Sequence, residues 1–219
     1  MLKKFGKLLT HKPKPEKARS IQQIAIFGSS HAKPESKVVM DAYKVCKQLA
    51  EAGYIIVNGG GPGVMRAATL GAKDGGGKVI GVTLYPKDIP HFEGRDPSNL
   101  FDVEIKTKTY VERTLALMKE GQVYIVFNGG TGTISEFGMA WGLARIYFGH
   151  HKPLILYGNF WKKIIHAFKQ NMIIVPEELQ VYKIADDPDG VLREIKDFED
   201  EIAKGKHKHL KTTKGDYNL

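Results

Sequence analysis

The residues of this chain that could do chemistry are concentrated in one glycine-rich stretch, Asn128–Glu136, which reads Asn-Gly-Gly-Thr-Gly-Thr-Ile-Ser-Glu. It follows an apolar run, Val123–Phe127, that is typical of a buried strand, and apolar residues at helical spacing come after it. Glycines at such a junction let the backbone approach a ligand, and the free N–H groups of a first helical turn favour a phosphate. The residues predicted here to bind phosphate are Gly129, Gly130, Thr131, Gly132 and Thr133.

Glu136 lies about one turn into the helix that this pattern predicts, so its carboxylate can lie beside whatever the loop holds. The stretch is not a P-loop, because no Gly-Lys-Ser/Thr follows, and it comes too late in the chain for the usual dinucleotide fingerprint. The alternative is a tight turn in which Ser135 and Glu136 are ordinary helix residues, since a glycine-rich turn alone is a weak motif.

Two further glycine turns follow predicted strands. Ile24–Phe27 ends in Gly28, Ser29 and Ser30, and Tyr54–Asn58 runs into the turn 59–63, Gly-Gly-Gly-Pro-Gly. In a parallel sheet all three turns lie at the same edge, where such sheets bind ligands. We therefore predict a nucleotide-sized pocket there. The residues that the two additional turns contribute to the prediction are Gly28, Ser29, Ser30, Gly60, Gly61 and Gly63.

The elements that must position these residues alternate between strand and helix from 24 to 198, which predicts a parallel sheet with right-handed crossovers. We expect an α/β fold with one doubly wound, mostly parallel, Rossmann-like sheet and helices on both faces. The expected strands are 24–27, 54–58, 78–83, 103–106, 123–127, 153–157 and 181–184. The main expected helices are 34–52, 64–72, 110–119, 161–168 and 189–198, together with the helix after the Gly-Thr loop.

Two of these segments carry more specific expectations. The helix 110–119 is predicted to bury Val111, Leu115 and Met118 on one face and to turn Arg113 elsewhere. Residues 85–100 contain three prolines and a glycine and read as a long irregular loop, in which Asp88 is a candidate for substrate contact.

The net charge of +9 is concentrated at the two ends of the chain. Residues 1–20 carry +6 and residues 204–219 carry +4, which leaves −1 for 21–203. We predict one folded domain over 21–203 between two basic flexible tails, with weak binding of the tails to anionic lipid or RNA as the alternative. The folded part offers no signal for sequence-specific nucleic-acid binding. No segment approaches the roughly 20 apolar residues of a membrane helix, and the single cysteine, Cys46, fits a reducing cytoplasm.

Four elements of the sequence, spread over about 24–198, resemble the Lonely Guy (LOG) family of Rossmann-like proteins. They are Phe27–Ser30, Gly59–Met65, Glu112-Arg113 with Met118, and Asn128–Glu136, against a family pattern Pro-Gly-Gly-x-Gly-Thr-x-x-Glu. The resemblance implies a phosphoribohydrolase, which cleaves the N-glycosidic bond of a purine nucleoside 5′-monophosphate to free base and ribose 5-phosphate. In cytokinin activation the substrate is an N6-modified adenosine monophosphate.

By this resemblance the Gly-Thr loop holds the 5′-phosphate, Met118 belongs to the substrate site, and Arg113 and Glu136 take the places of the catalytic pair. Cleavage builds positive charge on the ribose, which a carboxylate can stabilise. An arginine can clamp phosphate or orient that carboxylate. From the local sequence, Arg113 could equally be a surface residue paired with Glu112 or Glu120.

Two positions depart from the family pattern: Asn128 stands where the family has proline, and Thr114 stands where a basic residue usually follows the arginine. Relatives that carry molybdenum cofactor without hydrolysis make a binding protein the leading alternative. No lysine is placed for a pyridoxal phosphate Schiff base, so the family's older label of lysine decarboxylase has no support. We expect no cofactor and no metal site.

The resemblance also implies a homodimer whose helices complete each other's sites. The helix after the loop is apolar nearly all round, and such a helix needs burial on more than one side. The residues behind this expectation are Phe137, Met139, Trp141, Leu143, Ile146, Tyr147 and Phe148.

Overall fold

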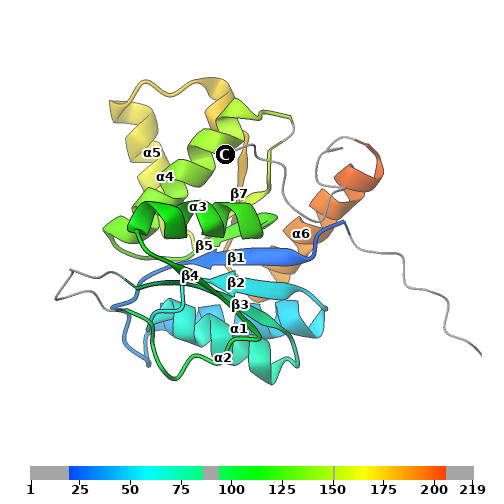
Figure 1. Ribbon diagram of the computed structural model, residues 1–219. Coiled ribbons are helices and arrows are strands. Elements are labelled where there is room, and N and C mark those ends of the chain that lie inside the picture. The colour runs from blue at the N-terminus through cyan, green and yellow to red at the C-terminus, as the bar shows by residue number, and fades with distance from the viewer. Residues whose placement is uncertain (1–19, 86–93, 150, 206–219) are drawn as a thin grey trace, which may run out of the picture.

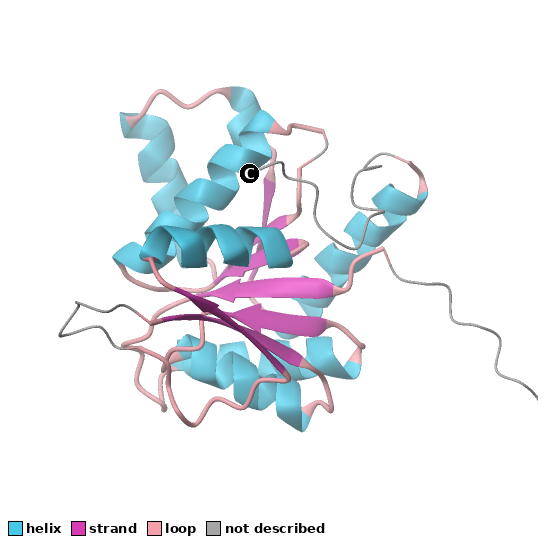
Figure 2. Ribbon diagram, viewed as in Figure 1, coloured by secondary structure: helices cyan, strands magenta, loops and turns pink. Residues whose placement is uncertain are grey.

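The computed structural model of the protein describes residues 20–85, 94–149 and 151–205, and within them it has one parallel sheet with helices on both faces (Figures 1 and 2). The sheet has seven strands in the order β4-β3-β2-β1-β5-β6-β7, and every neighbouring pair is parallel. The predicted fold class, a doubly wound Rossmann-like sheet, is therefore confirmed.

The strands are short apolar runs, as expected for strands that are covered on both faces. They are β1 Gln23–Phe27, β2 Ile55–Asn58, β3 Val79–Leu84, β4 Val103–Thr107, β5 Val123–Val126, β6 Leu154–Tyr157 and β7 Tyr182–Ala185. The helices are α1 Lys37–Glu51, α2 Val64–Asp74, α3 Tyr110–Glu120, α4 Thr131–Ile146, α5 Phe160–Asn171 and α6 Pro188–Ala203, with a 3₁₀ turn, η1, at Pro176–Leu179.

The helices divide into two groups that build two separate cores. α1, α2 and α6 pack on one face of the sheet, around residues such as Val45, Leu49 and Ile195. α3, α4 and α5 pack on the other face, around Leu117, Phe137 and Trp161. In Figure 1 the second group lies above the sheet and α1 and α2 lie below it. Every strand except β4 contributes side chains to both cores, and β4 contributes Ile105 to the second one.

The strand order reverses at β1, whose neighbours are β2 on one side and β5 on the other. At such a reversal the crossover helices leave toward opposite faces, and a crevice opens at the carboxyl ends of the strands. The turns that follow β1, β2 and β5 are the three glycine turns. The fold therefore brings them to one place.

The observed α3 corrects one prediction. Its buried residues are Arg113, Thr114, Leu117 and Met118, whereas Val111 is 61% exposed and Leu115 is 36% exposed. The predicted apolar face was wrong because two positions of the buried face are polar and two positions of the outer face are apolar. Met118 alone of the predicted three lies on the buried side.

Most element ends lie close to the predicted ones, with two informative differences. α1 begins at Lys37 with Ser36 as its N-cap rather than at Pro34. α6 continues to Ala203, beyond the expected end at Phe198, and its N-cap is Asp187, whose side chain accepts a bond from the Gly190 N–H. The predicted basic tails, apart from their innermost residues, and the candidate Asp88 lie outside the described residues.

Candidate functional site

A cavity of about 300 Å³ opens at the carboxyl ends of β1, β2 and β5. The three glycine turns therefore meet at a single cavity, as their positions after parallel strands predicted. Its volume lies at the lower end of the range for small-molecule sites. The lining residues are Gly28, Ser29, Ser30, His31, Gly59, Gly61, Pro62, Met65, Gly94, Tyr110, Arg113, Gly130, Thr131, Gly132, Thr133 and Glu136.

The N-terminus of α4 forms one wall of this cavity. The helix has Gly130 as its N-cap, no side chain caps it, and no acidic residue lies in its first turn. The first helical bond runs from Ile134 N to Gly130 O, so the N–H groups before Ile134 precede the intrahelical ladder. The N-terminus of α3 is different, because Thr109 and Glu112 close it with a reciprocal capping box. Of these two helix ends, that of α4 is the more favourable for an external anion, because no side chain of the protein caps its N–H groups.

Close packing joins the turns after β1 and β5. Ser29 N donates to Asn128 O at 3.1 Å. A Cβ at Gly129 would overlap Thr133 Oγ1 and lie 2.9 Å from Ser29 N, so only glycine fits there. Gly129 thus shapes the loop while Gly130, Thr131, Gly132 and Thr133 line the cavity.

Arg113 and Glu136 face each other inside the cavity. Arg113 Nη1 lies 3.5 Å from Glu136 Oε1, and the two side chains are only 10% and 8% exposed. Arg113 Nε donates to Val82 O at 3.2 Å, and Nη2 lies 3.5 Å from Met65 Sδ. The alternative in which Arg113 is a surface residue is therefore excluded, and Glu112 is engaged in the α3 capping box.

The position of the Arg113 guanidinium depends on Gly59. A Cβ at Gly59 would overlap Arg113 Nη2 and lie 2.9 Å from Met65 Sδ. The first glycine of the turn after β2 therefore makes the space that the guanidinium occupies. This requirement explains a glycine at 59 independently of any ligand.

α3, which carries Arg113, is held at both ends. Its capping box fixes the N-terminus, and at the C-terminus the buried Lys152 Nζ donates to Met118 O and Gly121 O, both at 2.7 Å. A lysine at a helix C-terminus satisfies carbonyl groups and complements the helix dipole. Tyr124 OH also donates to Met118 O. These bonds keep the guanidinium at a constant position relative to the sheet.

Burial raises the pKa of the Glu136 carboxyl to about 7, although the neighbouring Arg113 charge lowers it. Both protonation states of Glu136 are therefore populated near neutral pH. A carboxyl poised in this way suits general acid–base work.

The structure places most of the predicted residues in the cavity and four of them elsewhere. Gly60 lies behind the wall, where its N–H is bonded to Asn58 Oδ1 at 2.8 Å. Gly63 packs against the backbone of Ser29 and Ser30, Gly129 supports the loop, and Met118 is fully buried in the core. Asp88 lies outside the described residues.

Some cavity residues were not predicted as site residues. His31 follows the predicted turn at Ser30, and Met65 ends the quoted glycine-rich motif, so simple extension of both motifs would have found them. Tyr110 lies three residues before Arg113, at helical spacing, and its OH donates to Gly132 O at 3.4 Å. Gly59, Pro62 and Gly94 complete this group.

The two departures from the LOG pattern have different surroundings. Asn128 is exposed, and its backbone oxygen bonds Ser29 N, a role that proline could also fill. Thr114 is buried, and its Oγ1 donates to Tyr110 O at 3.0 Å. The Thr114 side chain is thus directed to its own helix, and it does not line the cavity.

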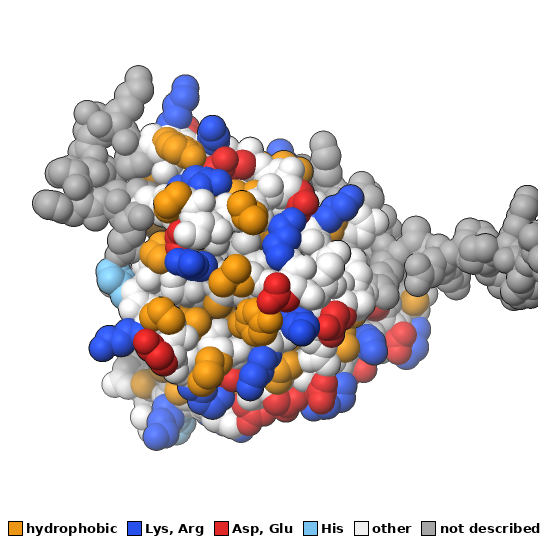
Figure 3. All heavy atoms as spheres, turned by 90° about the horizontal axis from the view of Figure 1, so that it is seen from below, with side chains coloured by type: hydrophobic (Ala, Val, Ile, Leu, Met, Phe, Trp, Pro, Cys, Tyr) orange, Lys and Arg blue, Asp and Glu red, His pale blue; other side chains and the backbone are white. Residues whose placement is uncertain are grey.

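A second, apolar groove lies between α1 and α2, on the face shown in Figure 3. It shares Ser30 and Pro62 with the candidate site, and its walls include Met40, Tyr43 and Leu70. In Figure 3 hydrophobic side chains gather at the centre of this face, with Lys and Arg among and around them.

Among the described residues, no group of His, Cys, Asp and Glu side chains is arranged to hold a metal ion. No helix in the described part of the chain is long and apolar enough to cross a membrane.

A sequence profile of the SLOG cluster4 family matches residues 21–181. The chain belongs to this LOG-like family. The resemblance to LOG proteins that the four sequence elements indicated is thereby confirmed, and the matched residues include all three glycine turns, Arg113 and Glu136.

Curated relatives of this SLOG cluster4 protein include two of Oryza sativa subsp. japonica, each described as a probable cytokinin riboside 5′-monophosphate phosphoribohydrolase. One is 31% identical over 144 residues, which cover 63% of this chain and 54% of that protein. The other is 26% identical over 190 residues, which cover 81% of this chain and 73% of that protein. An uncharacterized protein of Archaeoglobus fulgidus is 32% identical over 120 residues, which cover 55% of this chain and 74% of the relative.

Solved structures with a similar fold include molybdenum cofactor proteins. The Moco carrier protein of Chlamydomonas reinhardtii has a TM-score of 0.60 and 24% identity, covering 84% of this chain and 99% of that one. The molybdenum cofactor binding protein of Rippkaea orientalis has a TM-score of 0.56 and 24% identity, covering 81% of this chain and 97% of that one. At this identity the similarity shows a common fold.

Proposed function

We propose that this protein is a nucleoside 5′-monophosphate phosphoribohydrolase that releases a purine base and ribose 5-phosphate. The observation that carries the proposal is the buried pair of Arg113 and Glu136 beside the open N-terminus of α4. An anion site and a carboxylate lie in one cavity, and the reaction needs both. The names of the two rice relatives support the same reaction and suggest N6-modified, cytokinin-type nucleotides as substrates.

The phosphate is proposed to bind at the start of α4, where Thr131 and Thr133 add hydroxyl donors to the backbone N–H groups. Helical side chains lean toward the N-terminus of their helix. The Glu136 carboxylate is therefore directed toward the end of α4 at which the phosphate binds. This arrangement leaves the ribose between phosphate and carboxylate.

In the proposed reaction the bond between C1′ and the base nitrogen breaks, and its electron pair leaves with the base. The oxygen of a water molecule forms a bond to C1′, and one proton of that water passes to Glu136. Glu136 then gives this proton to the departing base nitrogen, which regenerates the carboxylate. Positive charge on the ribose develops as the bond breaks, and the ionised carboxylate stabilises it. A protein that only binds a nucleotide gains little from a carboxylate beside a phosphate, since like charges repel.

Arg113 is proposed to orient Glu136 and to keep a fraction of it ionised. The positive charge of its guanidinium lowers the pKa of the Glu136 carboxyl, which opposes the effect of burial. Val82 O and Met65 Sδ hold the guanidinium from the other side.

We further propose that the protein forms a homodimer through the outer face of α3 and α4. Part of the apolar surface of α4 is covered within the same chain, because Phe137 is buried and Trp141 stacks on Phe137 and Phe168. Ile134 is 42% exposed, and the exposed Val111 and Leu115 lie on the adjoining α3. Because Tyr110 and Gly132 join these two helices at the cavity, a partner on this face lies next to the site.

The test is an incubation of the wild-type protein with a panel of nucleoside monophosphates and the matching nucleosides, with free base and ribose 5-phosphate assayed. We expect base and ribose 5-phosphate in equal amounts from at least one purine monophosphate and no base from nucleosides, which lack the phosphate. A protein that binds nucleotide and releases no base from any of them would instead be a carrier-like binding protein.

A further inference from the structure

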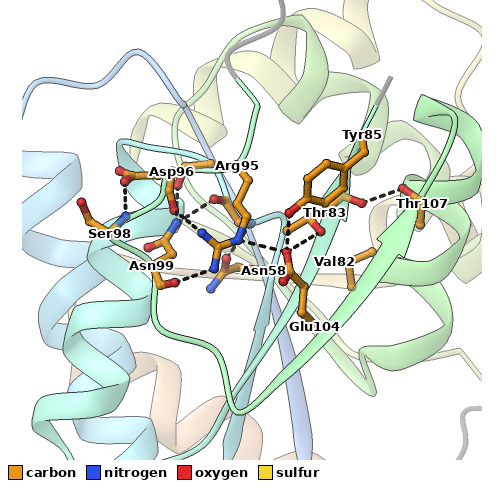
Figure 4. A network of polar contacts seen from close by, with 12 residues as sticks. Asn58, Val82, Thr83, Tyr85, Arg95, Asp96, Ser98, Asn99, Glu104 and Thr107 are labelled. Atoms are coloured by element: carbon orange, nitrogen blue, oxygen red, sulfur yellow. Dashed lines mark hydrogen bonds and ion pairs between the residues drawn. The ribbon is translucent and has the colours of Figure 1, made fainter. Parts of the chain in front are cut away.

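The segment 94–101 lies against the glycine turn after β2 and donates hydrogen bonds to the carbonyl groups of that turn (Figure 4). Asn99 is fully buried, and its Nδ2 donates to Gly60 O at 2.7 Å and to Gly61 O at 3.0 Å. Asp96 N donates to Gly60 O at 2.9 Å. The orientation of the carboxamide follows from these contacts, because only its NH₂ group can donate to two carbonyls.

These bonds determine which way the turn presents its polar groups. In a trans peptide the C=O and the following N–H point in opposite directions. Since Gly60 O is bonded to Asn99, the Gly61 N–H points away from Asn99, and Gly61 lines the cavity. On the other side Asn58 Oδ1 accepts from Gly60 N at 2.8 Å. Asn58 and Asn99 thus hold the turn with two carbonyl oxygens directed away from the cavity.

Asn99 is itself held by a network that reaches β3 and β4. Arg95 Nη2 donates to Asn99 O at 3.2 Å and Arg95 Nε donates to Glu104 Oε1 at 3.0 Å. Glu104 also accepts from Thr83 Oγ1 at 2.9 Å and Tyr85 OH at 3.1 Å. Burial alone would raise the pKa of Glu104, but these hydrogen bonds and the Arg95 charge hold it below its usual value, so the carboxylate stays ionised.

An aromatic contact fixes the end of the segment. The Arg95 guanidinium lies over the Phe101 ring, 5.2 Å from its centroid. The ring occupies the space above Gly81 of β3, where a Cβ would lie 2.6 Å from it. The segment is therefore docked on the sheet, and Asn99 has a defined position relative to the cavity.

We propose that Asn99 is a positioning residue of the nucleotide site, which it serves by turning the Gly61 N–H toward a hydrogen-bond acceptor of the bound nucleotide and keeping the Gly60 and Gly61 oxygens away from its negative charge. The proposal rests on the proposed function in that the ligand is a nucleoside monophosphate. Asn99 does not line the cavity and touches no reacting atom.

The test compares Asn99→Ala with a matched control, Gln122→Ala. Gln122 is a buried amide whose Oε1 accepts from Gln22 N and Gln23 N at 2.7 and 3.0 Å, beside the opposite ends of β1 and β5. Each variant removes a buried amide that bonds backbone groups of another segment, two for Asn99 and three for Gln122, whose Nε2 also donates to Ser20 O at 3.3 Å. We therefore expect both variants to lower the melting temperature. Only Asn99→Ala should weaken AMP binding and raise the KM, by about tenfold, the loss expected for one hydrogen bond to a charged group.

Two more variants separate the donor role from packing. Asn99→Asp keeps the volume but presents a carboxylate to two carbonyl oxygens, and it should weaken AMP binding at least as much as Asn99→Ala. Asn99→Ser retains one donor and should give an intermediate Kd, and it replaces Asn99→Ala if that variant does not fold. For all of them we expect kcat to change less than KM, because the catalytic pair is untouched.

An Asn99→Ala protein that melts like the control and binds AMP as tightly as wild type would overturn the proposal, since Asn99 would then be purely structural. If wild type binds AMP without releasing base, the phosphoribohydrolase proposal fails. The Kd values of wild type and Asn99→Ala for AMP then still test whether Asn99 positions the binding site. If wild type binds neither AMP nor inorganic phosphate, both proposals are wrong.

Discussion

Glu136 is a carboxyl buried beside a single positive charge, and this makes the stability of the protein depend on pH. Burial raises its pKa from 4.5 to about 7 on folding. The folded state therefore binds more protons than the unfolded state between those values, and the free energy of unfolding falls as the pH rises through that window. At pH values below this window the free energy of unfolding has its full value, because Glu136 is protonated in both states. At pH values above the window the decrease in the free energy of unfolding is complete.

We predict that Glu136→Gln removes this dependence. Relative to the variant, wild type should lose about 3 kcal/mol of unfolding free energy between about pH 4 and pH 8, from the size of the pKa change. Chemical denaturation of both proteins across this range measures it. Parallel stability curves for the two proteins would show that Glu136 titrates normally.

Gly59 is the second residue whose role can be tested by a single substitution, because it makes the space that the Arg113 guanidinium occupies. In Gly59→Ala the new methyl group would overlap Arg113 Nη2, and the flexible guanidinium would have to move away from Glu136. We expect kcat/KM to fall by about 10²-fold, a loss that a misplacement of about 1 Å can cause. The fold should persist, because the group that must move is the end of a side chain.

The control for this variant is Gly138→Ala on α4, where an added methyl group meets nothing within 4 Å. It should leave kcat/KM unchanged and stabilise the helix by up to about 1 kcal/mol. Full activity in Gly59→Ala would mean that the guanidinium position is not needed for the reaction.

At the scale of elements, the outer surfaces of α3 and α4 carry apolar side chains that the fold of one chain does not bury. Val111 is 61% exposed on α3 and Ile134 is 42% exposed on α4, although the same helices bury polar residues inside. Contiguous exposed apolar patches mark interaction sites, and we interpret these side chains as part of one.

We predict that Val111→Glu converts a wild-type dimer to a monomer, because the charge would have to be buried without a partner. Sedimentation at micromolar protein concentration measures the change. The matched control is Met40→Glu, which places the same charge on α1, on the opposite face, at a residue that is 48% exposed. A monomeric wild type, or equal effects of the two variants, would contradict the proposed interface.

At the scale of the whole molecule, the parallel sheet and its ligand edge could be predicted from sequence because they depend on local patterns. Apolar runs such as Ile24–Phe27 and Val123–Phe127 mark strands by themselves, and each glycine turn directly follows one. Glu136 was placed in the cavity by its helical distance from the loop. These inferences need only the period of the helix and the rule that ligands bind at the carboxyl ends of parallel strands.

The features that could not be predicted depend on contacts between distant residues. The prediction of which face of α3 is buried was wrong, because the apolar pattern could not show that Arg113 packs against Gly59 and Glu136. These two residues lie on other elements. Lys152 caps a helix that precedes it by more than thirty positions, and Asn99 bonds a turn nearly forty residues earlier. A lysine and an asparagine outside any motif read as surface residues until the fold is known.

The most direct test of the proposed reaction is base release from a purine nucleoside monophosphate by wild type and Glu136→Gln, with the Kd for the same nucleotide measured in parallel. The phosphate site does not include Glu136, so we expect the variant to bind at least as tightly as wild type. Base release should fall by about 10²-fold or more, the scale of a catalytic acid–base group. Equal rates of release by the two proteins, or no release by wild type from any nucleotide that it binds, would contradict the proposal.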